Sequence, residues 1–553
     1  MGLAWSDESI VVLDATLADV ILSLEHLGPR WVWWSARDTA VAVVASGVRP
    51  RTCWDLSAVS RMLDGIRRED PPAVWAATLQ LAGPVPLPTG DPDLLDLAAE
   101  ADRSGVDADH RLPNDWAGRA WRRDPDAVAA WAERALQCAE LQWQRLERVP
   151  DPRAAPGQPP LAVVTAQAES AAALLAIELE HDGLPLDRHV AGELLTRFAA
   201  PRAQDATAEH RLRRARDAVV LQHFPGESVD LRNPAQVREL LARIGLDLPD
   251  TRSWRLLPHA ATLPAVAALL SWRKAERLLT TFGWTWLDMH VGPDGRLRGT
   301  WGAADAAAGR MTAQSGLHNL PAELRPAVRA EEGFVFVRAD LGQIEPRVLA
   351  VVSGDPGLAA AAGEADMYAP VAAALGCDRP TAKIAVLAAM YGQTSGTAGA
   401  ALRDMDRTYP IAMAYLRDAE AAGSAHRDTR TYGGRLLPVS RVRQRDAEPL
   451  GEHVAVSGGL GRFVRNAVVQ GAAAELFKAW AATVRHGLLG TSGQIVLCLH
   501  DELLVHVPKQ QAPDCARLLD DALQSVSSWW AAGSGVRFVA EVGVGASWPE
   551  ASA

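Results

Sequence analysis

Two acidic segments, far apart in the sequence, each place a carboxylate at the end of an apolar run. GFVFVRADLGQIEP (333–346) predicts a strand that ends at Asp340, followed by a helix with Pro346 in its first turn. QIVLCLHDELLVHVP (494–508) predicts a β-hairpin whose turn holds His500, Asp501 and Glu502. Neighbouring carboxylates repel each other and resist burial, and a divalent cation relieves both costs. Asp340 alone is most simply a helix cap or a surface carboxylate, whereas its pairing with Asp501 predicts phosphoryl transfer with two metal ions.

A helix is predicted over CDRPTAKIAVLAAMYGQ (377–393), where Asp378 is a good N-cap and Gly392 a good C-terminal stop. Residues spaced by four share one broad face of such a helix, and here they are Arg379, Lys383, Leu387 and Tyr391. The two cations lie at the N-terminal end, which already attracts anions and suits a triphosphate. The apolar and aromatic residues that follow suit a sugar and a base. A solvated amphipathic helix is the alternative explanation.

Together these segments resemble motifs A, B and C of family A DNA polymerases, the bacterial polymerase I type. Asp340-Leu-Gly-Gln-Ile-Glu-Pro-Arg347 is similar to D-Y-S-Q-I-E-L-R, the 379–392 spacing to R-x₃-K-x₇-Y-G, and 500–502 to H-D-E. The segments 309–321 and 462–478 resemble T-G-R-L-S-S…L-Q-N-I-P and R-x₃-N-x₃-Q-G-x-A-A-D-I, and 161–290 resembles the family's thumb.

The resemblance implies a cofactor of two Mg²⁺ ions, with Mn²⁺ as a substitute. Asp340, Asp501 and the Leu341 carbonyl would be the ligands, with Glu502 as a less essential neighbour. Lys383 would also protonate the pyrophosphate leaving group, which an ammonium can do and a guanidinium cannot. The residues implied to bind the incoming nucleotide are Arg379, Lys383, Gln343, Glu345, Leu387, Tyr391 and Tyr368. Those implied to contact DNA are Arg310, Gln470 and His500 on the primer–template duplex, and Arg462 and Asn466 on the template side.

The chain departs from the family at three places in this region. Leu341-Gly342 replaces Tyr-Ser, which leaves the backbone ligand in place. Leu387 stands where the family has Phe or Tyr beside the sugar, so we expect altered sugar discrimination and lower efficiency. Tyr368 occupies the position of a family His, and a phenol can still donate a hydrogen bond to phosphate.

The expected fold is an α/β N-terminal domain, exonuclease-like and thus RNase H-like, followed by an α+β right-hand polymerase domain. Residues 1–150 would form the former, ending at the Pro-rich linker 147–160. The short apolar runs IVVLD, WVWW and VAVVA begin this domain and suggest its α/β character. The rest would divide into a thumb-like helical region (161–295), a palm (296–355 and 440–553) and fingers (356–439).

The N-terminal region lacks the residues that an exonuclease of this family uses. The family places D-x-E on a first strand and Y-x₃-D on a late helix. Residues 1–150 contain no D-x-E, the nearest approach being Asp14-Ala-Thr16, and the first tyrosine of the chain is Tyr368. We therefore expect an exonuclease-like fold that has lost its 3′–5′ activity. Its tryptophans, among them Trp31, Trp33, Trp34 and Trp54, are expected in the core.

Composition sets the remaining expectations for this chain of 553 residues. The sequence holds no run of about 18 apolar residues and no secretory signal. The five scattered cysteines fit a reducing environment, so we expect a protein of the bacterial cytoplasm that associates with the nucleoid. The net charge of −11 predicts a salt-sensitive grip on DNA unless a basic cleft forms. We expect a monomeric DNA-directed DNA polymerase acting on primer–template DNA and dNTPs, without proofreading, in repair or gap filling. The alternatives are a low-fidelity or translesion polymerase, and a DNA-binding protein with vestigial catalysis.

Overall fold

The structure is a computed structural model that describes residues 1–6, 8–12, 15–81, 106, 110–112, 125–153, 155–305, 308–392, 397–443, 459–499 and 501–552. The chain divides into two compact units. Unit 1 comprises Met1–Asp182, Thr300–Ala313 and Gly333–Val544, and unit 2 comprises Gly183–Gly299, Gln314–Glu332 and Gly545–Ala553. The helical region predicted over 161–295 is therefore divided, because its first helix belongs to unit 1.

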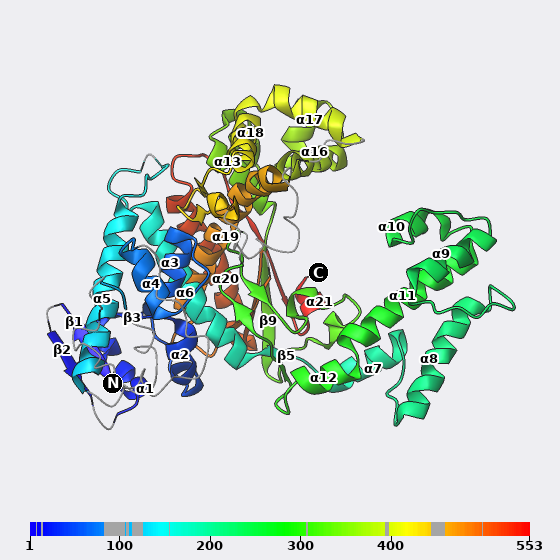
Figure 1. The fold of residues 1–553 in the computed structure, drawn as a ribbon, viewed down its shortest axis with the longest axis horizontal. Helices are drawn as coiled ribbons and strands as arrows, with labels where there is room; N and C mark the ends of the chain where they lie inside the picture. The colour runs from blue at the N-terminus through cyan, green and yellow to red at the C-terminus, as the bar shows by residue number, and fades with distance from the viewer. Residues whose placement is uncertain are drawn as a thin grey trace. The chain divides into compact units, whose positions relative to one another are not determined.

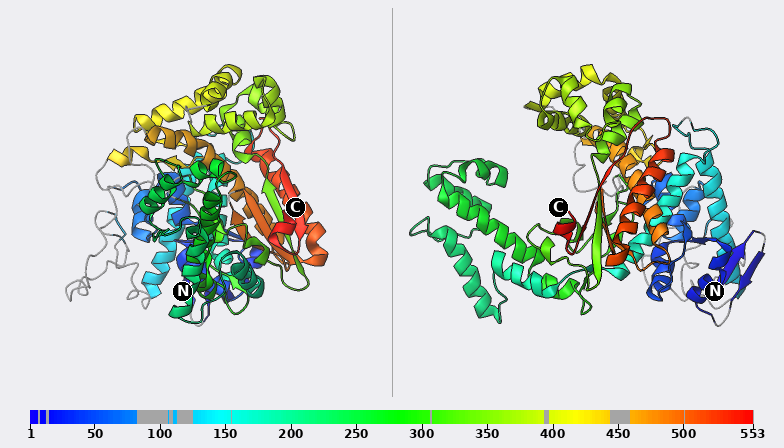
Figure 2. Two further views of the ribbon diagram at one scale, coloured as in Figure 1. Left: turned by 90° about the vertical axis from the view of Figure 1, so that its right-hand side faces the viewer. Right: turned by 180° about the vertical axis from the view of Figure 1, so that it is seen from behind.

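A four-stranded sheet in unit 1 carries the predicted acidic segments. Its strand order is β12-β13-β9-β14, with β13 antiparallel to both of its neighbours. Every residue of β13 except the last is buried, so its near-continuous apolar run suits a central strand. The helices α19 and α20 run alongside this sheet (Figure 2). The elements are β9 (Phe334–Leu341), β12 (Gln494–Leu499), β13 (Glu502–Pro508), β14 (Ala540–Gly545), α19 (Gly459–Leu488) and α20 (Ala512–Trp530).

The helices that follow β9 and precede α19 in the sequence form a group that carries the predicted nucleotide-binding face (Figure 1). The predicted helix after residue 378 is α16, which begins after the N-cap Asp378 and ends before Gly392 at a φ of 65°. Helices continue along the chain as far as Ser424. The helices of this group are α13 (Ile344–Ser353), α14 (Pro356–Ala362), α15 (Tyr368–Leu375), α16 (Arg379–Tyr391), α17 (Thr397–Thr408) and α18 (Pro410–Ser424).

The N-terminal part of unit 1 alternates strands and helices, as predicted. The strands form two separate two-stranded sheets, the antiparallel pair β1–β2 and the parallel pair β3–β4. The exonuclease-like architecture stays a prediction, and Asp14 lies outside the described residues. The elements are β1 (Gly2–Trp5), β2 (Glu8–Val11), α1 (Leu17–Leu24), β3 (Arg30–Trp33), α2 (Ala36–Ala45), β4 (Thr52–Asp55), α3 (Leu56–Asp64), α4 (Pro71–Thr78), α5 (Pro125–Glu147) and α6 (Leu161–Asp182).

The apolar run VAVVA does not form a strand, because it lies in α2. Ser35 caps this helix by accepting a hydrogen bond from the Arg37 backbone N–H. The buried residues are Ala36, Ala40, Val43 and Val44, which follow helical spacing and outweigh the β-propensity of valine. The tryptophan prediction is confirmed for Trp33, Trp34 and Trp54, which are all buried.

Unit 2 is largely helical around its own core. The helix α11 packs against α8, and buried side chains such as Val266, Leu269 and Trp272 fill the space between the helices. The strands β5 and β6 form a short antiparallel pair in this unit. The elements are β5 (Leu184–Pro185), α7 (Arg188–Phe198), α8 (Ala206–Leu221), α9 (Pro234–Arg243), α10 (Ser253–Leu256), α11 (Pro264–Phe282), α12 (Trp284–His290), β6 (Arg296–Leu297) and α21 (Trp548–Ala551). The short pair β7 (Trp301–Gly302) and β8 (Thr312–Ala313) belongs to unit 1.

Although the sequence holds no uninterrupted run of about 18 apolar residues, the helix α6 is long and apolar enough to cross a membrane by length and composition. In this structure 78% of its apolar window is buried inside the protein, as expected for a core helix. Two of its carboxylates, Glu169 and Glu178, are buried and pair with residues of α19. Glu169 accepts from the Lys478 ammonium at 2.7 Å, and Glu178 accepts from the Arg485 guanidinium at 2.6 Å.

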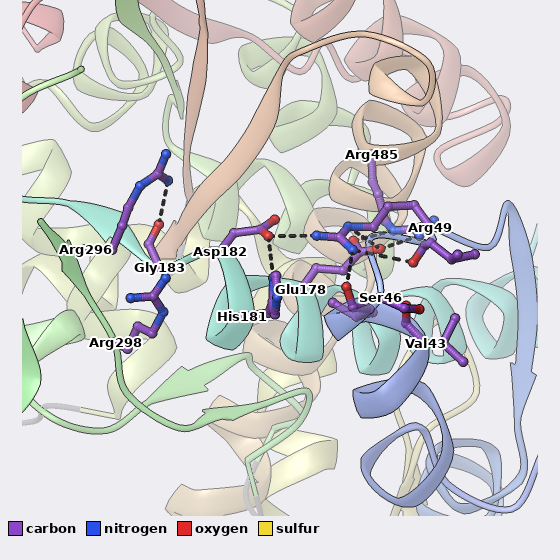
Figure 3. Close-up of polar contacts among 12 residues, drawn as sticks. Val43, Ser46, Arg49, Glu178, His181, Asp182, Gly183, Arg296, Arg298 and Arg485 are labelled. Carbon is purple, nitrogen blue, oxygen red and sulfur yellow. Dashed lines mark hydrogen bonds and ion pairs between the residues drawn. The ribbon is translucent and has the colours of Figure 1, made fainter. Parts of the chain in front are cut away.

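These buried ion pairs hold α6, α19 and the segment before β4 together. Figure 3 shows Arg485 and Arg49 converging on the end of α6, where Arg49 donates to Asp182 at 2.7 Å. Arg485 also donates to the Pro50 carbonyl at 2.8 Å. Because both members of the Glu178–Arg485 pair are buried, each charge depends on the other for compensation.

We predict that Arg485→Met destabilises unit 1, because it leaves the Glu178 carboxylate buried without its main partner, at a cost of about 3–5 kcal/mol. The apparent melting temperature should fall by several degrees. Arg517→Met, which removes an arginine with a 69% exposed side chain, is the matched control and should change it little. Adding Glu178→Leu to Arg485→Met should restore most of the loss, and no recovery would contradict this explanation.

Candidate active site

The register between β9 and β13 brings the predicted carboxylates together. Asp340 lies directly opposite Glu502 across the two strands. The backbone N–H of Leu341 donates to the Asp501 carbonyl at 2.9 Å. Glu502 belongs to β13 rather than to the hairpin turn, which corrects the predicted turn, and His500 lies outside the described residues. Because the flanking side chains are buried, a slip of one residue would send apolar side chains to the wrong face, so this register is strongly specified.

Burial and neighbouring carboxylates raise the pKa of both Asp501 and Asp340. The pKa of Asp501 is raised to about 6, first by burial and then by the charge of Asp340, with smaller effects from Glu502 and Glu345. The pKa of Asp340 is also raised, first by burial, while Arg338 opposes the shift and Glu502 and Glu541 add to it. Such a cluster of carboxylates favours the binding of a cation.

Arg338 is a residue of this site that the sequence analysis missed. Its Nη2 donates to Asp340 Oδ2 at 2.5 Å and to Glu502 Oε2 at 2.8 Å. The available signal was its position two residues before Asp340, because residues i and i+2 of a strand share one face.

The donor set fits a hard divalent cation. Asp340 and Asp501 supply carboxylate oxygens, which Mg²⁺ prefers. Their pKa values are raised first by burial and also by neighbouring carboxylates, and a bound cation would relieve both costs. Among the described residues no three His, Cys, Asp or Glu side chains are grouped to hold a metal ion. The protein therefore offers two carboxylates and leaves positions for water, substrate oxygens or a backbone carbonyl such as that of Leu341.

The predicted face of α16 is exposed, while its opposite face is buried. Arg379 and Lys383 are exposed, Tyr391 is 38% exposed, and Leu387 is half-buried between them. The buried face consists of Ala382, Ala385, Val386, Ala388, Ala389 and Met390. The helix is thus anchored by small apolar residues and presents its cations outward at the N-terminal end.

Asp366, a second residue that the sequence analysis did not select, fixes the position of Arg379. Its Oδ2 accepts from Arg379 Nε at 2.6 Å, and its Oδ1 accepts from Gln343 Nε2 at 2.8 Å. Tyr368 is buried at 4% exposure, and the Arg379 guanidinium lies 5.6 Å from its ring centroid. The pKa of Asp366 is lowered, first by the hydrogen bond from Arg379. The Tyr368 ring thus makes a cation–π contact with the Arg379 guanidinium.

Glu345 links the end of α16 to two other segments, and its charge contributes to the raised pKa of Asp501. Tyr391 donates its hydroxyl to Glu345 Oε2 at 3.1 Å. Burial raises the pKa of Glu345, while Tyr391, the Arg310 charge and a hydrogen bond with Gln470 oppose the shift. Four residues that the sequence analysis selected from separate segments therefore meet: Glu345, Tyr391, Arg310 and Gln470.

The other predicted DNA contacts lie on α19, one and two turns before Gln470. Arg462 is exposed, and Asn466 is half-buried with no hydrogen-bond partner for its Oδ1 among the described residues. Arg465, on the buried side, donates to the Ala389 carbonyl at 2.6 Å and ties α19 to the end of α16. The helix thus carries residues of the candidate site on one side and an anchor on the other.

Arg347 holds the turn that follows Asp340. Its side chain is fully buried and donates to the carbonyls of Ala362, Ala365 and Arg537 at 2.6–2.7 Å, and to that of Gly342 at 3.2 Å. Gln343, within this turn, has a φ of 59°, in the left-handed region that side chains rarely adopt. The arginine therefore fixes a strained turn between β9 and α13.

Comparison with known proteins places these features in a family. The family model described as DNA polymerase family A matches residues 202–550, more than half of the chain. DNA polymerase I of Chloroflexus aurantiacus is 30% identical over 293 residues, which cover 48% of this chain and 30% of that protein. DNA polymerase I of Pseudomonas aeruginosa is 25% identical over 465 residues, which cover 76% of this chain and 47% of that protein. The matches thus span between about a third and a half of these relatives.

A solved structure shares the fold. The POL domain of Pol1 from M. smegmatis, in complex with DNA primer-template and dNTP, aligns with a TM-score of 0.66 at 21% identity. The alignment covers 97% of this chain and 89% of that one. At this identity the likeness shows a common fold.

We predict that Arg347→Lys destabilises unit 1, because a lysine cannot replace the forked donors that hold four carbonyls. Each lost charge-assisted bond costs about 1.5–3 kcal/mol, so the apparent melting temperature should drop clearly. Arg407→Lys, at a side chain that is 78% exposed, should leave it unchanged. Equal melting temperatures for both variants would mean that Arg347 does not hold the turn.

Proposed function

Because this chain belongs to DNA polymerase family A, we propose that it is a DNA-directed DNA polymerase that adds deoxynucleotides to a primer 3′-hydroxyl. The observation that carries the proposal is the position of Glu345. Its charge acts on Asp501, and its carboxylate accepts from Tyr391, so the exposed face of α16 ends beside the paired carboxylates. A triphosphate-binding face next to a metal-binding pair is the arrangement that nucleotidyl transfer needs.

Asp340 and Asp501 would hold two Mg²⁺ ions, or Mn²⁺ in their place, with the Leu341 carbonyl assisting and Glu502 alongside. When bound, two such ions stabilise charge on the attacking and leaving oxygens of a phosphoryl transfer. Residues of this chain would bind the triphosphate and donate the proton to the leaving group. Arg379, held by Asp366, binds triphosphate oxygens as a fork, and Lys383 binds them as a point charge and donates a proton to the departing pyrophosphate.

The remaining site residues would recognise sugar, base and duplex. Glu345 and Tyr391 form a hydrogen-bonded pair that packs under the deoxyribose and leaves no room for a 2′-hydroxyl. The DNA itself would be contacted by Arg310, Arg462, Asn466, Gln470 and His500. Primer–template DNA and dNTPs are thus the proposed partners of a monomeric enzyme in the bacterial cytoplasm.

We further propose that the enzyme lacks proofreading, which suits repair or gap filling. In the described part of residues 1–150 the strand-end carboxylate Asp55 is committed to capping. It accepts from the backbone N–H groups of Ala36 at 2.6 Å and Ala58 at 2.8 Å. Asp64 is paired with Arg145. Carboxylates engaged in this way support loss of the exonuclease site.

A low-fidelity polymerase is the second candidate, and Leu387 favours it. This side chain lies on the exposed face of α16 between Lys383 and Tyr391, where a flat aromatic wall would hold the sugar more firmly. A smaller aliphatic wall would permit more nucleotide misalignment.

We predict that the protein extends a 5′-labelled primer on a longer template with Mg²⁺ and dNTPs, and that Asp501→Asn reduces extension at least about a hundredfold by removing a metal-ligand carboxylate. Asp514→Asn, an exposed carboxylate on α20, is the matched control and should leave extension intact. Without dNTPs the primer should keep its length.

Extension that persists in Asp501→Asn would contradict the assigned site. Absence of extension by the unaltered protein would favour a DNA-binding role with vestigial catalysis. Primer shortening without dNTPs would refute the loss of proofreading.

A further inference from the structure

Arg338 contacts two carboxylates of the candidate metal site. One nitrogen, Nη2, touches both Asp340 Oδ2 and Glu502 Oε2. The Arg338 side chain is 14% exposed and that of Glu502 is 7% exposed, so the contact between these two is shielded from water, whereas the Asp340 side chain is 31% exposed. Shielding strengthens the attraction between these charges compared with a surface ion pair.

The strand register explains why one guanidinium reaches both carboxylates. Arg338 and Asp340 share one face of β9, and Glu502 stands opposite Asp340 and diagonal to Arg338. Long side chains span such diagonals. The arginine is therefore built into the same register that assembles the carboxylates.

The remaining donors of Arg338 show that the carboxylates determine its position. Its Nε is buried and has no hydrogen-bond partner among the described residues. A buried donor without a partner is costly, so the contacts of Nη2 must offset that cost. A side chain held in this way can leave if a stronger cation takes over its carboxylates.

We propose that Arg338 is a positioning residue that acts as an internal counter-ion and competes with divalent cations for Asp340 and Glu502. The inference rests on the proposed function for the role of the ion, but it concerns binding of the ion itself. A carboxylate oxygen that already accepts from a guanidinium binds a metal more weakly, and the two positive charges repel each other. Metal loading through Asp340 Oδ2 in the free protein therefore requires Arg338 to move off that oxygen.

A purely structural role makes the opposite prediction. If Arg338 only neutralised the cluster so that the strands could pair, its removal would lower stability and would not tighten metal binding. If it competes, its removal must raise metal affinity even where stability falls. Metal affinity is thus the readout that separates the two roles.

The test is a titration of the full chain with Mn²⁺, in which electron paramagnetic resonance measures the free ion. The Kd of Arg338→Met should be lower than that of the unaltered protein by about tenfold or more, the equivalent of one charge-assisted hydrogen bond. Arg338→Gln should show the same gain and covers the case in which the Met variant does not fold. Arg338→Lys, which keeps the charge, should stay within about threefold of the unaltered protein.

Two further variants control this experiment. Arg517→Met removes an equal charge from an exposed position on α20 and should not change the Kd. Adding Asp501→Asn to Arg338→Met should abolish the gain, which places the ion at this cluster. Unchanged or weaker Mn²⁺ binding in both Arg338→Met and Arg338→Gln would overturn the inference, as would a gain that survives Asp501→Asn. Failure of primer extension with the gain intact would refute the proposed function alone.

Discussion

The site depends on a single pairing, the antiparallel register that sets Asp340 opposite Glu502 with Asp501 at the adjoining turn. Repulsion between neighbouring carboxylates opposes folding, and burial adds to this cost because it disfavours the charged form of each group. The buried apolar side chains of β9 and β13 supply the free energy that holds the pairing in place. The remaining repulsion between the carboxylates attracts cations, and the Arg338 guanidinium already offsets part of it by donating to Asp340.

Other elements of unit 1 are arranged around this pairing. Arg347 fixes the turn after β9, Asp366 fixes the cation at the start of α16, and Glu345 links the end of α16 to the carboxylates. The buried pairs between α6 and α19 keep the long helix that carries Gln470 against the core. Each contact converts a flexible side chain into one with a defined position, which is what catalysis by positioning requires.

Much of this arrangement could be predicted from sequence, because local signals and family motifs pointed to the same elements. The N-cap Asp378 and the stop at Gly392 fixed the ends of α16, and the spacing of four placed its exposed face. The apolar runs fixed β9, β12 and β13. The family resemblance, rather than any local pattern, brought Arg310, Glu345, Tyr391 and Gln470 to one site, and the structure places them together.

The rest depended on tertiary contacts that local patterns do not encode. Arg338 looked like a charged residue on a strand, because its partner Glu502 is 164 residues away. Asp366 looked like a loop carboxylate until Arg379 and Gln343 were placed beside it. The run VAVVA gave only the signal of a short apolar run, whereas its cap and buried face make it a helix. The apolar character of α6 was hidden by Glu169 and Glu178, whose partners come from α19.

The most direct test of the account is the position of a bound ion, found by anomalous diffraction from crystals of the protein grown with Mn²⁺. The account predicts an anomalous peak within coordination distance of both the Asp340 and the Asp501 carboxylates, with the Arg338 guanidinium displaced from Asp340. An ion bound elsewhere, or the two carboxylates too far apart to share one, would contradict it.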